Sequence, residues 1–165
     1  MQAPALPANE MERLAAVHRL HLLDTAPEER FDRITRLACR VFDVSMAFVT
    51  LIDSDRQFIK SQPAELNFCN TSREVSFCGH AILADDIFVV EHTMMDPRFF
   101  DNPLVNGPPH IRFYAGQPVK SPDGFNVGTL CLVDSKSRGF PDNDVLTLQD
   151  MAHWVEFEMG RSGHH

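Results

Sequence analysis

The sequence element best suited to chemistry is Cys78-Gly79-His80, in which a thiol and an imidazole lie two residues apart. A thiol near a helix start is more readily deprotonated than a free cysteine, and an imidazole nearby can act as its base. Residues two positions apart on a helix nevertheless point to different sides. We therefore expect Cys78 to be buried and slow to alkylate, with His80 hydrogen-bonded elsewhere. Redox chemistry by Cys69 and Cys78 is the alternative.

A second group with chemical potential consists of Asp96, Arg98, Asn102 and Arg112. A guanidinium can bind a carboxylate or phosphate through two parallel hydrogen bonds, so these residues could recognise an anionic ligand. They could equally form an internal Asp–Arg network, because the backbone of a proline-rich loop needs partners. Nearby aromatic residues would supply pocket walls or plain core, namely Phe77, Phe99, Phe113 and Tyr114.

The cysteines and histidines are too dispersed for a metal site, which needs ligands at short spacing. His18 and His21 are three positions apart and could hold a transition metal only weakly. We expect no native metal. The remaining candidate ligands are spread over about two dozen residues, namely Cys69, Cys78, His80 and His92.

Composition excludes several classes of function. The 165 residues include 15 Lys and Arg against 23 Asp and Glu, a formal charge of −8. This balance argues against binding to nucleic acid or anionic lipid through bulk charge. The longest apolar run, around Met46–Leu51, is far shorter than the ~20 residues of a membrane span, so we expect no membrane insertion. The N-terminus resembles no signal peptide, which predicts a cytoplasmic protein with reduced cysteines.

Hydrophobic spacing predicts the elements that position these residues. Val44–Asp53 is apolar on both faces, which is typical of a central strand covered on both sides. A tight turn joins it to a strand over Arg56–Ser61 as an antiparallel hairpin. A second hairpin joins Ile111–Val119 to Phe125–Asp134 through a turn containing Pro and Gly. Three further helices are predicted, one from Glu10 to about Leu23, one after Pro27, and a last one that Asp142 or Asn143 caps and that runs to about Met159. The remaining predicted elements are a loop over Gln62–Thr71, a short Ser76-capped helix over Phe77–Ala84 and a strand over Ile87–Val90.

This order of elements predicts an α+β domain with a central antiparallel sheet flanked by helices on both sides, and with the N- and C-terminal helices packed together. Residues 1–9 are expected to be a flexible lead-in, 10–159 the domain, and 160–165 the remnant of a tag or linker. The terminal helices carry more apolar surface than one sheet contact requires, which predicts a parallel homodimer. The candidate interface residues are Met11, Leu14, Met151, Trp154 and Met159.

Short motifs along the chain resemble those of one family. They are Leu22-Leu23-Asp24-Thr25, Pro27-Glu28-Glu29-Arg30-Phe31-Asp32, Val49–Asp53, Asp55-Arg56-Gln57, Ser76–Ile82, Asp96-Pro97-Arg98-Phe99, Asn102–Val105, Ile111–Gly116 and Gly128-Thr129-Leu130-Cys131. Together they resemble a GAF domain of the subtype found in bacterial sensor histidine kinases and diguanylate cyclases. The resemblance covers nearly the whole chain.

The resemblance implies a sheet of five or six strands and a sensory input domain. Such a domain would catalyse nothing itself, would bind a small ligand or relay a conformational signal, and would pass it to a kinase or cyclase output domain. The alternatives are a thiol redox enzyme or sensor and a dimerisation module without a ligand. The candidate ligand-binding residues are Phe77, Cys78, His80, Asp96, Arg98, Phe99, Asn102, Arg112 and Tyr114.

Departures from the family's specialised members narrow the expected chemistry. GAF-type free methionine sulfoxide reductases carry a catalytic cysteine in the segment that corresponds to His110–Gly116, where this sequence has none. Bilin-binding GAF domains place His directly after the linking Cys, whereas Gly79 intervenes here. The signature of cyclic-nucleotide GAF domains is also missing from the sequence. No cofactor is therefore indicated.

Overall fold

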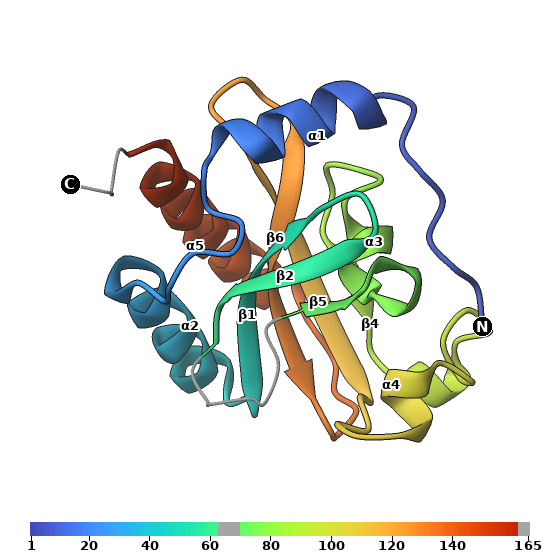
Figure 1. Ribbon diagram of the computed structural model, residues 1–165. Coiled ribbons are helices and arrows are strands. Elements are labelled where there is room, and N and C mark those ends of the chain that lie inside the picture. The colour runs from blue at the N-terminus through green and yellow to red at the C-terminus, as the bar shows by residue number, and fades with distance from the viewer. Residues whose placement is uncertain (63–69, 162–165) are drawn as a thin grey trace.

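The computed structural model describes residues 1–62 and 70–161, which form an α+β fold around one six-stranded sheet (Figure 1). The strand order is β3-β2-β1-β6-β5-β4, and every neighbouring pair is antiparallel. The strands are β1 (Met46–Ile52), β2 (Arg56–Ser61), β3 (Asn70–Ser72), β4 (Phe88–Val90), β5 (Phe113–Lys120) and β6 (Asn126–Asp134). The helices are α1 (Glu10–Arg19), α2 (Glu29–Phe42), α3 (Phe77–Ala81), α4 (Pro103–Asn106) and α5 (Asp142–Gly160), with 3₁₀ turns η1 (Arg73–Val75) and η2 (Thr93–Met95).

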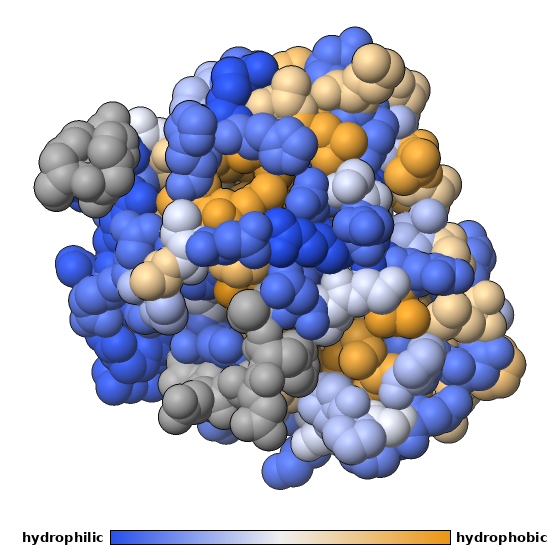
Figure 2. Space-filling model, viewed as in Figure 1, coloured by the Kyte–Doolittle hydropathy of each residue, from blue (hydrophilic) through white to orange (hydrophobic). Residues whose placement is uncertain are grey.

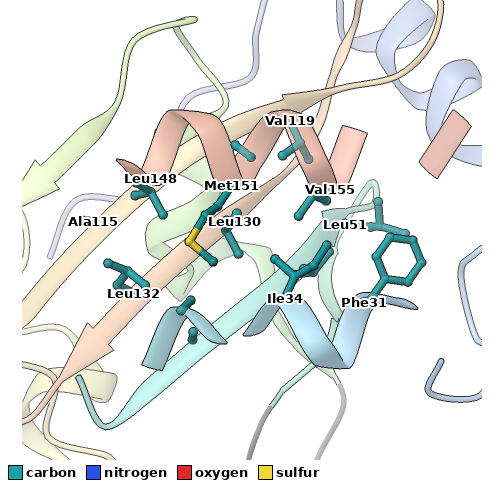
Figure 3. Packing of buried hydrophobic residues seen from close by; sticks show 14 of the residues in the cluster. Phe31, Ile34, Leu51, Ala115, Val119, Leu130, Leu132, Leu148, Met151 and Val155 are labelled. Carbon is teal, nitrogen blue, oxygen red and sulfur yellow. The ribbon is translucent and has the colours of Figure 1, made fainter. Parts of the chain in front are cut away.

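Helices cover both faces of the sheet, as the sequence predicts. α2 and α5 lie on one face, whereas α3 and α4 lie on the other (Figure 1). A hydrophobic core lies beneath α2 and α5, and Figure 3 shows Ile34 of α2 and Val155 of α5 converging on Leu130 of β6. Burial of these side chains contributes most of the stability of such a layer, at roughly 25 cal/mol per Å² of apolar surface.

The central strand β1 alternates as its sequence predicts. Val49 and Leu51 point into the core beneath α2 and α5, while Phe48 and Ile52 point to the opposite face. β1 is central in the sheet, and its two faces lie in two separate hydrophobic cores, one beneath α2 and α5 and one beneath α3. This arrangement explains why apolar residues occupy both of its faces.

Two element boundaries differ from the prediction. α1 ends at Arg19 rather than near Leu23, because His21 and Asp24 adopt positive φ angles of 54° and 61° that a helix cannot accommodate. Asn70–Ser72 forms the edge strand β3 instead of loop. A three-residue polar strand has no hydrophobic alternation to reveal it. Cys69, in the same predicted loop, lies outside the described residues.

The predicted N-terminal cap is confirmed for α3 and is wrong for α5. Ser76 caps α3, because its hydroxyl accepts a hydrogen bond from the Gly79 amide at 3.0 Å. The last helix was expected to be capped by Asp142 or Asn143. Instead Pro141 precedes α5, and no side chain caps it.

The terminal helices pack differently from the prediction. α5 packs against α2 and against the sheet at β5 and β6, whereas α1 crosses the end of β6 (Figure 1). Arg13 fixes α1 there, because its Nη1 donates to the Asn126 carbonyl oxygen of β6 at 3.4 Å. Only the C-terminal end of α1 approaches α5, where Leu20 and Met159 line a common surface pocket.

This packing changes the predicted dimer interface. Met151 and Met159 are only 7% and 4% exposed and belong to the core beneath α5, so neither is available to a second chain. Met11 is 84% exposed, but it starts α1 at the end remote from α5 (Figure 1). Leu14 and Trp154 are half-buried. The five predicted residues therefore do not form one continuous surface.

A charged cluster ties α1 to the sheet. Glu10 accepts hydrogen bonds from Arg13 Nε at 2.8 Å and from Arg73 Nη1 at 2.5 Å. The two arginines are 1% and 4% exposed, so Glu10 neutralises guanidinium groups that water scarcely reaches. Breaking such a pairing leaves an uncompensated buried charge, which is strongly destabilising.

The first nine residues contain no helix or strand, yet they contact the layer formed by α3. The Gln2 amide donates to the Arg98 carbonyl oxygen at 3.1 Å, and Pro4 packs beside Gly79. The segment expected to be a loose lead-in is therefore held against the domain. Within residues 1–62 and 70–161, no helix has the length and apolarity needed to cross a membrane.

Candidate functional site

A cavity of about 210 Å³ lies between the sheet and the layer formed by α3 and α4. β1, β2, β5 and β6 provide its floor, and α3 and α4 each contribute to its walls. Figure 2 shows a group of hydrophobic residues at the surface next to the position of α4 in Figure 1. The lining residues are Met46, Phe48, Gln57, Ile59, Thr71, Phe77, Cys78, Leu104, Pro108, Pro109, Ile111, Tyr114, Cys131 and Val133.

The cavity lining is apolar and carries no charged side chain among the described residues. Its polar exceptions are few. Gln57 of β2 is 8% exposed, and its Nε2 donates to Thr71 Oγ1 at 3.1 Å. The Oε1 atom of Gln57 is buried and accepts no hydrogen bond from any described residue. Leaving a buried acceptor unpaired costs roughly 1–3 kcal/mol, which a bound donor would recover.

A hydrogen-bonded sulfur cluster forms another part of the wall. Tyr114 donates its hydroxyl to Cys78 Sγ at 3.1 Å, and Thr129 Oγ1 donates to the same sulfur at 3.2 Å. Cys131 Sγ lies 3.8 Å from Cys78 Sγ. Gly116 makes room for this arrangement, because a Cβ there would lie 2.1 Å from the Tyr114 hydroxyl oxygen.

This environment separates the two thiols electrostatically. Burial raises the pKa of Cys78, but hydrogen bonds from Cys131, Thr129 and Tyr114 outweigh it and bring that pKa down to about 7. Burial and the neighbouring Cys78 raise the pKa of Cys131 well above its usual range. Cys78 is therefore the more readily ionised thiol of the pair, and Cys131 is the one held in its protonated form.

His80 takes no part in the sulfur cluster. Its Nε2 lies 3.0 Å from the Gln2 carbonyl oxygen, and its ring packs edge-on against Phe99 at 4.9 Å between centroids. Burial lowers the pKa of His80, and the charge of Arg98 lowers it further. The expectation of a buried Cys78 with His80 bonded elsewhere is therefore confirmed.

The predicted polar group is structural. Asp96 pairs with Arg98 at 2.7 Å, and Arg112 takes no part in this ion pair. Arg112 Nη1 instead donates to the carbonyl oxygens of Val105 and Ile111, at 2.9 Å and 3.2 Å. These bonds fix the loop that leads into β5, as the alternative interpretation predicts.

Asn102 likewise serves the loop, because its Oδ1 accepts from the Leu104 amide and starts α4. The residues expected to recognise an anion therefore lie apart from the cavity. Of the nine predicted ligand-binding residues, the cavity brings together three, namely Phe77, Cys78 and Tyr114. The six that do not line it are His80, Asp96, Arg98, Phe99, Asn102 and Arg112.

The prediction missed Gln57 and Cys131, two of the most informative residues of the lining. Cys131 reaches Cys78 because β6 lies beside β1 at the centre of the sheet, and local sequence patterns do not reveal that pairing. A usable indication did exist. Thr129, Cys131 and Val133 alternate with the larger aliphatic residues of β6, so all three had to face away from the core beneath α5.

Comparison with known proteins matches this sequence and fold to one family. The family model for the GAF domain matches residues 26–159. The chain is 38% identical over 156 residues to the cyclic di-GMP phosphodiesterase PA2567 of Pseudomonas aeruginosa. That match covers 94% of this chain and 26% of the relative, so the chain spans about a quarter of the relative's length.

Solved structures show the same fold at low sequence identity. The GAF domain from an Acinetobacter phosphoenolpyruvate-protein phosphotransferase superposes with a TM-score of 0.64 at 13% identity, covering 90% of this chain and 92% of that one. A free methionine-R-sulfoxide reductase from Neisseria meningitidis, solved with its substrate, gives 0.64 at 18% identity and covers 98% of both chains.

These comparisons correct one expectation and establish the family. The chain was expected not to be an enzyme, but its relative is named a phosphodiesterase and several of the similar folds are methionine-R-sulfoxide reductases. That expectation is contradicted. Across residues 1–62 and 70–161, no cluster of three His, Cys, Asp or Glu side chains is arranged to hold a metal. With a matched segment that covers most of its length, the chain belongs to the GAF domain family.

Proposed function

We propose that this GAF domain is the sensory domain of a bacterial signalling protein and that it binds a small, uncharged, largely apolar ligand. The observation that carries the proposal is the 210 Å³ apolar cavity, with the unpaired Oε1 of Gln57 in its wall. An apolar cavity of about 150 Å³ in another protein accommodates benzene, so this volume suits a ligand of one or two rings.

The ligand is expected to be uncharged because the described lining contains no Asp, Glu, Lys, Arg or His side chain, and the Cys78 sulfur already accepts hydrogen bonds from Tyr114 and Thr129. Transferring an unpaired ion into such a cavity is prohibitively costly. Arg98 and Arg112, the nearest predicted anion receptors, are already committed to Asp96 and to backbone carbonyls. One N–H or O–H group on the ligand would satisfy Gln57 Oε1 and fix the orientation of the ligand.

The activity proposed for the full-length protein rests on the similarity to the phosphodiesterase. Similarity to a cyclic di-GMP phosphodiesterase over a quarter of that protein favours a full-length protein that acts on cyclic di-GMP. The dinucleotide itself is not the proposed occupant of the cavity, since it is large and carries two phosphates. In this proposal the cavity senses a different molecule and the output domain meets the dinucleotide.

Indole provides a direct test, because it is apolar, uncharged and carries a single N–H. We expect saturable binding that raises the melting temperature. The Gln57→Leu substitution should weaken indole binding about fivefold to tenfold, because it removes an acceptor worth about 1 kcal/mol or slightly more. Binding of 1-methylindole, which has no N–H, should change little in the same variant. Isothermal titration calorimetry measures all four affinities.

Gln117→Leu is the matched control, because Gln117 also has a buried, unpaired Oε1 but lies outside the cavity. Indole affinity should be unchanged in this variant. Absence of saturable indole binding at millimolar concentration, or equal weakening by both substitutions, would count against the proposed ligand class. It would favour a dimerisation module without a ligand.

We also propose that the domain forms a homodimer through α5. Its solvent side carries Leu146 and Phe157, which are 60% and 64% exposed, beside the half-buried Trp154. Trp154→Glu should weaken association at least tenfold, measured by sedimentation equilibrium, because it places a charge in an apolar seam. Val41→Glu is the control, since Val41 is 50% exposed on α2. A strictly monomeric parent protein at hundreds of micromolar would contradict the dimer.

A further inference from the structure

The cavity wall contains two thiols from distant parts of the chain. Cys78 comes from α3 and Cys131 from β6, and their sulfurs are 3.8 Å apart. A disulfide bond measures about 2.05 Å, so the sulfurs must approach by about 1.8 Å to form one. Side-chain rotation and a small displacement of one element can supply such a movement.

Of the two elements that carry the thiols, α3 is the one that lies outside the hydrogen-bonded sheet. Cys131 lies in the interior of the sheet, where its strand is paired with both β1 and β5. Cys78 lies in a helix of only five residues, outside the sheet. The hydrogen-bonded strands hold Cys131 in place, and Cys78 can approach it.

The hydrogen bonds around Cys78 prepare it as the first sulfur to react. The Tyr114 and Thr129 hydroxyls both donate to it, and the Cys131 sulfur lies 3.8 Å away. These three neighbours outweigh the effect of burial and lower the pKa of Cys78 to about 7, which favours the thiolate, the reactive form of cysteine. Cys39 provides a contrast, because partial burial and the charge of Asp134 raise its pKa.

Access to the two sulfurs is limited by size and charge. They are 3% and 1% exposed, yet both line a cavity with room for water-sized molecules. Hydrogen peroxide is uncharged and close to water in size, so it can enter. A charged peptide disulfide is too large for this cavity and meets no countercharge in the described lining.

From this geometry we propose that Cys78 and Cys131 form a peroxide-oxidised dithiol site that closes an intramolecular disulfide. The Cys78 thiolate attacks one oxygen of hydrogen peroxide, the O–O bond breaks, and the departing hydroxide takes up a proton as water. Cys78 is then a sulfenic acid. The Cys131 sulfur attacks it, loses its proton, and displaces the hydroxyl group as a second water. Overall, two thiols and one peroxide give one disulfide and two waters.

Formation of the disulfide does not depend on the proposed ligand. The effect of the disulfide on ligand binding rests on the proposed function. Drawing α3 toward β6 brings two walls of the cavity together. If the proposed function holds, the oxidised protein should therefore bind indole several-fold more weakly than the reduced protein. Formation of the disulfide without any indole binding by either form would contradict the ligand proposal alone.

The test is oxidation of the reduced chain with a slight excess of hydrogen peroxide at pH 7. Remaining thiols are then alkylated in denaturant and the peptides are mapped by mass spectrometry. Before alkylation, we expect the oxidised chain to be lighter than the reduced chain by two hydrogens. After alkylation, the peptide map should show Cys78 joined to Cys131 and Cys39 alkylated. In the Cys131→Ser variant, oxidation should stop at a sulfenic acid on Cys78 that dimedone traps.

A second variant tests the hydrogen-bonded cluster. Tyr114→Phe removes one donor from the Cys78 sulfur without removing the ring, so oxidation at pH 7 should slow about fivefold, because a rise of one pKa unit from about 7 lowers the thiolate fraction by that factor. The rate in this variant should recover at higher pH. Two outcomes overturn the proposal. One is oxidation of Cys39 or Cys69 while Cys78 and Cys131 stay reduced, and the other is a disulfide between Cys78 and any partner except Cys131.

Discussion

The Gly128→Ala substitution is expected to prevent stable folding. A Cβ atom at position 128 would lie 1.8 Å from the Thr50 carbonyl oxygen and 2.7 Å from its carbonyl carbon. Both are backbone atoms of β1, so no side-chain rotation can relieve the overlap. The pairing of β6 with β1 at the centre of the sheet must open instead. We expect a loss of about 4 kcal/mol or more, a large part of a typical domain's stability of roughly 5–15 kcal/mol.

Urea denaturation followed by circular dichroism measures this loss. Gly139→Ala is the matched control, because the nearest atom to a Cβ there is Glu91 Oε2 at an ordinary contact distance of 3.7 Å. The control should unfold within about 1 kcal/mol of the parent protein. A Gly128→Ala protein as stable as the control would mean that β1 and β6 are spaced more widely than described.

The second large effect is expected at Glu10. Glu10→Ala leaves Arg13 and Arg73 buried without their shared carboxylate. Removing one partner of a buried ion pair costs about 3–5 kcal/mol, and the loss should appear as a lower denaturation midpoint. Glu29→Ala is the control, since Glu29 pairs with Arg36 on the exposed side of α2 and its loss should have little effect. Equal effects of the two substitutions would contradict the structural role of Glu10.

The contribution of Glu10 should depend on pH in a defined direction. Partial burial raises the pKa of Glu10, but hydrogen bonds and charge attraction from Arg13 and Arg73 outweigh it and lower the pKa below 4.5. A lowered folded-state pKa means that the stabilisation is fully present above the unfolded pKa near 4.5 and is lost as pH falls through the folded value. The stability difference between parent and Glu10→Gln should therefore shrink below pH 4.5.

The fold was predictable because its strongest patterns are local. The two-faced apolar run of β1, the Pro-Asp-Gly turn between β5 and β6, and the Ser76 cap each specify an element from a few neighbouring residues. The end of α1 was not predictable in the same way. It depends on the positive φ angles of His21 and Asp24, residue types that other contexts allow within helices.

The candidate site was harder to predict because its members meet only through long-range pairing. Charged residues attracted attention in the sequence, yet Arg112 and Asn102 are committed to holding loops. The cavity itself is lined by residues whose polar groups are few and ordinary. Gln57 is distinguished only by an oxygen left without a partner, which a sequence does not reveal.

The alternation of β6 has a thermodynamic consequence. Cys131 and Val133 line the cavity, while Leu130 and Leu132 lie in the core beneath α5. One strand therefore contacts whatever occupies the cavity on one face and the helix that leads toward any following domain on the other. If a shift of this strand stabilises the ligand-bound state by about 1.4 kcal/mol, the affinity of the cavity for its ligand rises tenfold. Coupling of this kind between two sites is reciprocal. A molecule that binds α5 must then change the affinity of the cavity for its ligand by a certain factor. The ligand in the cavity must change the affinity of α5 for that molecule by the same factor.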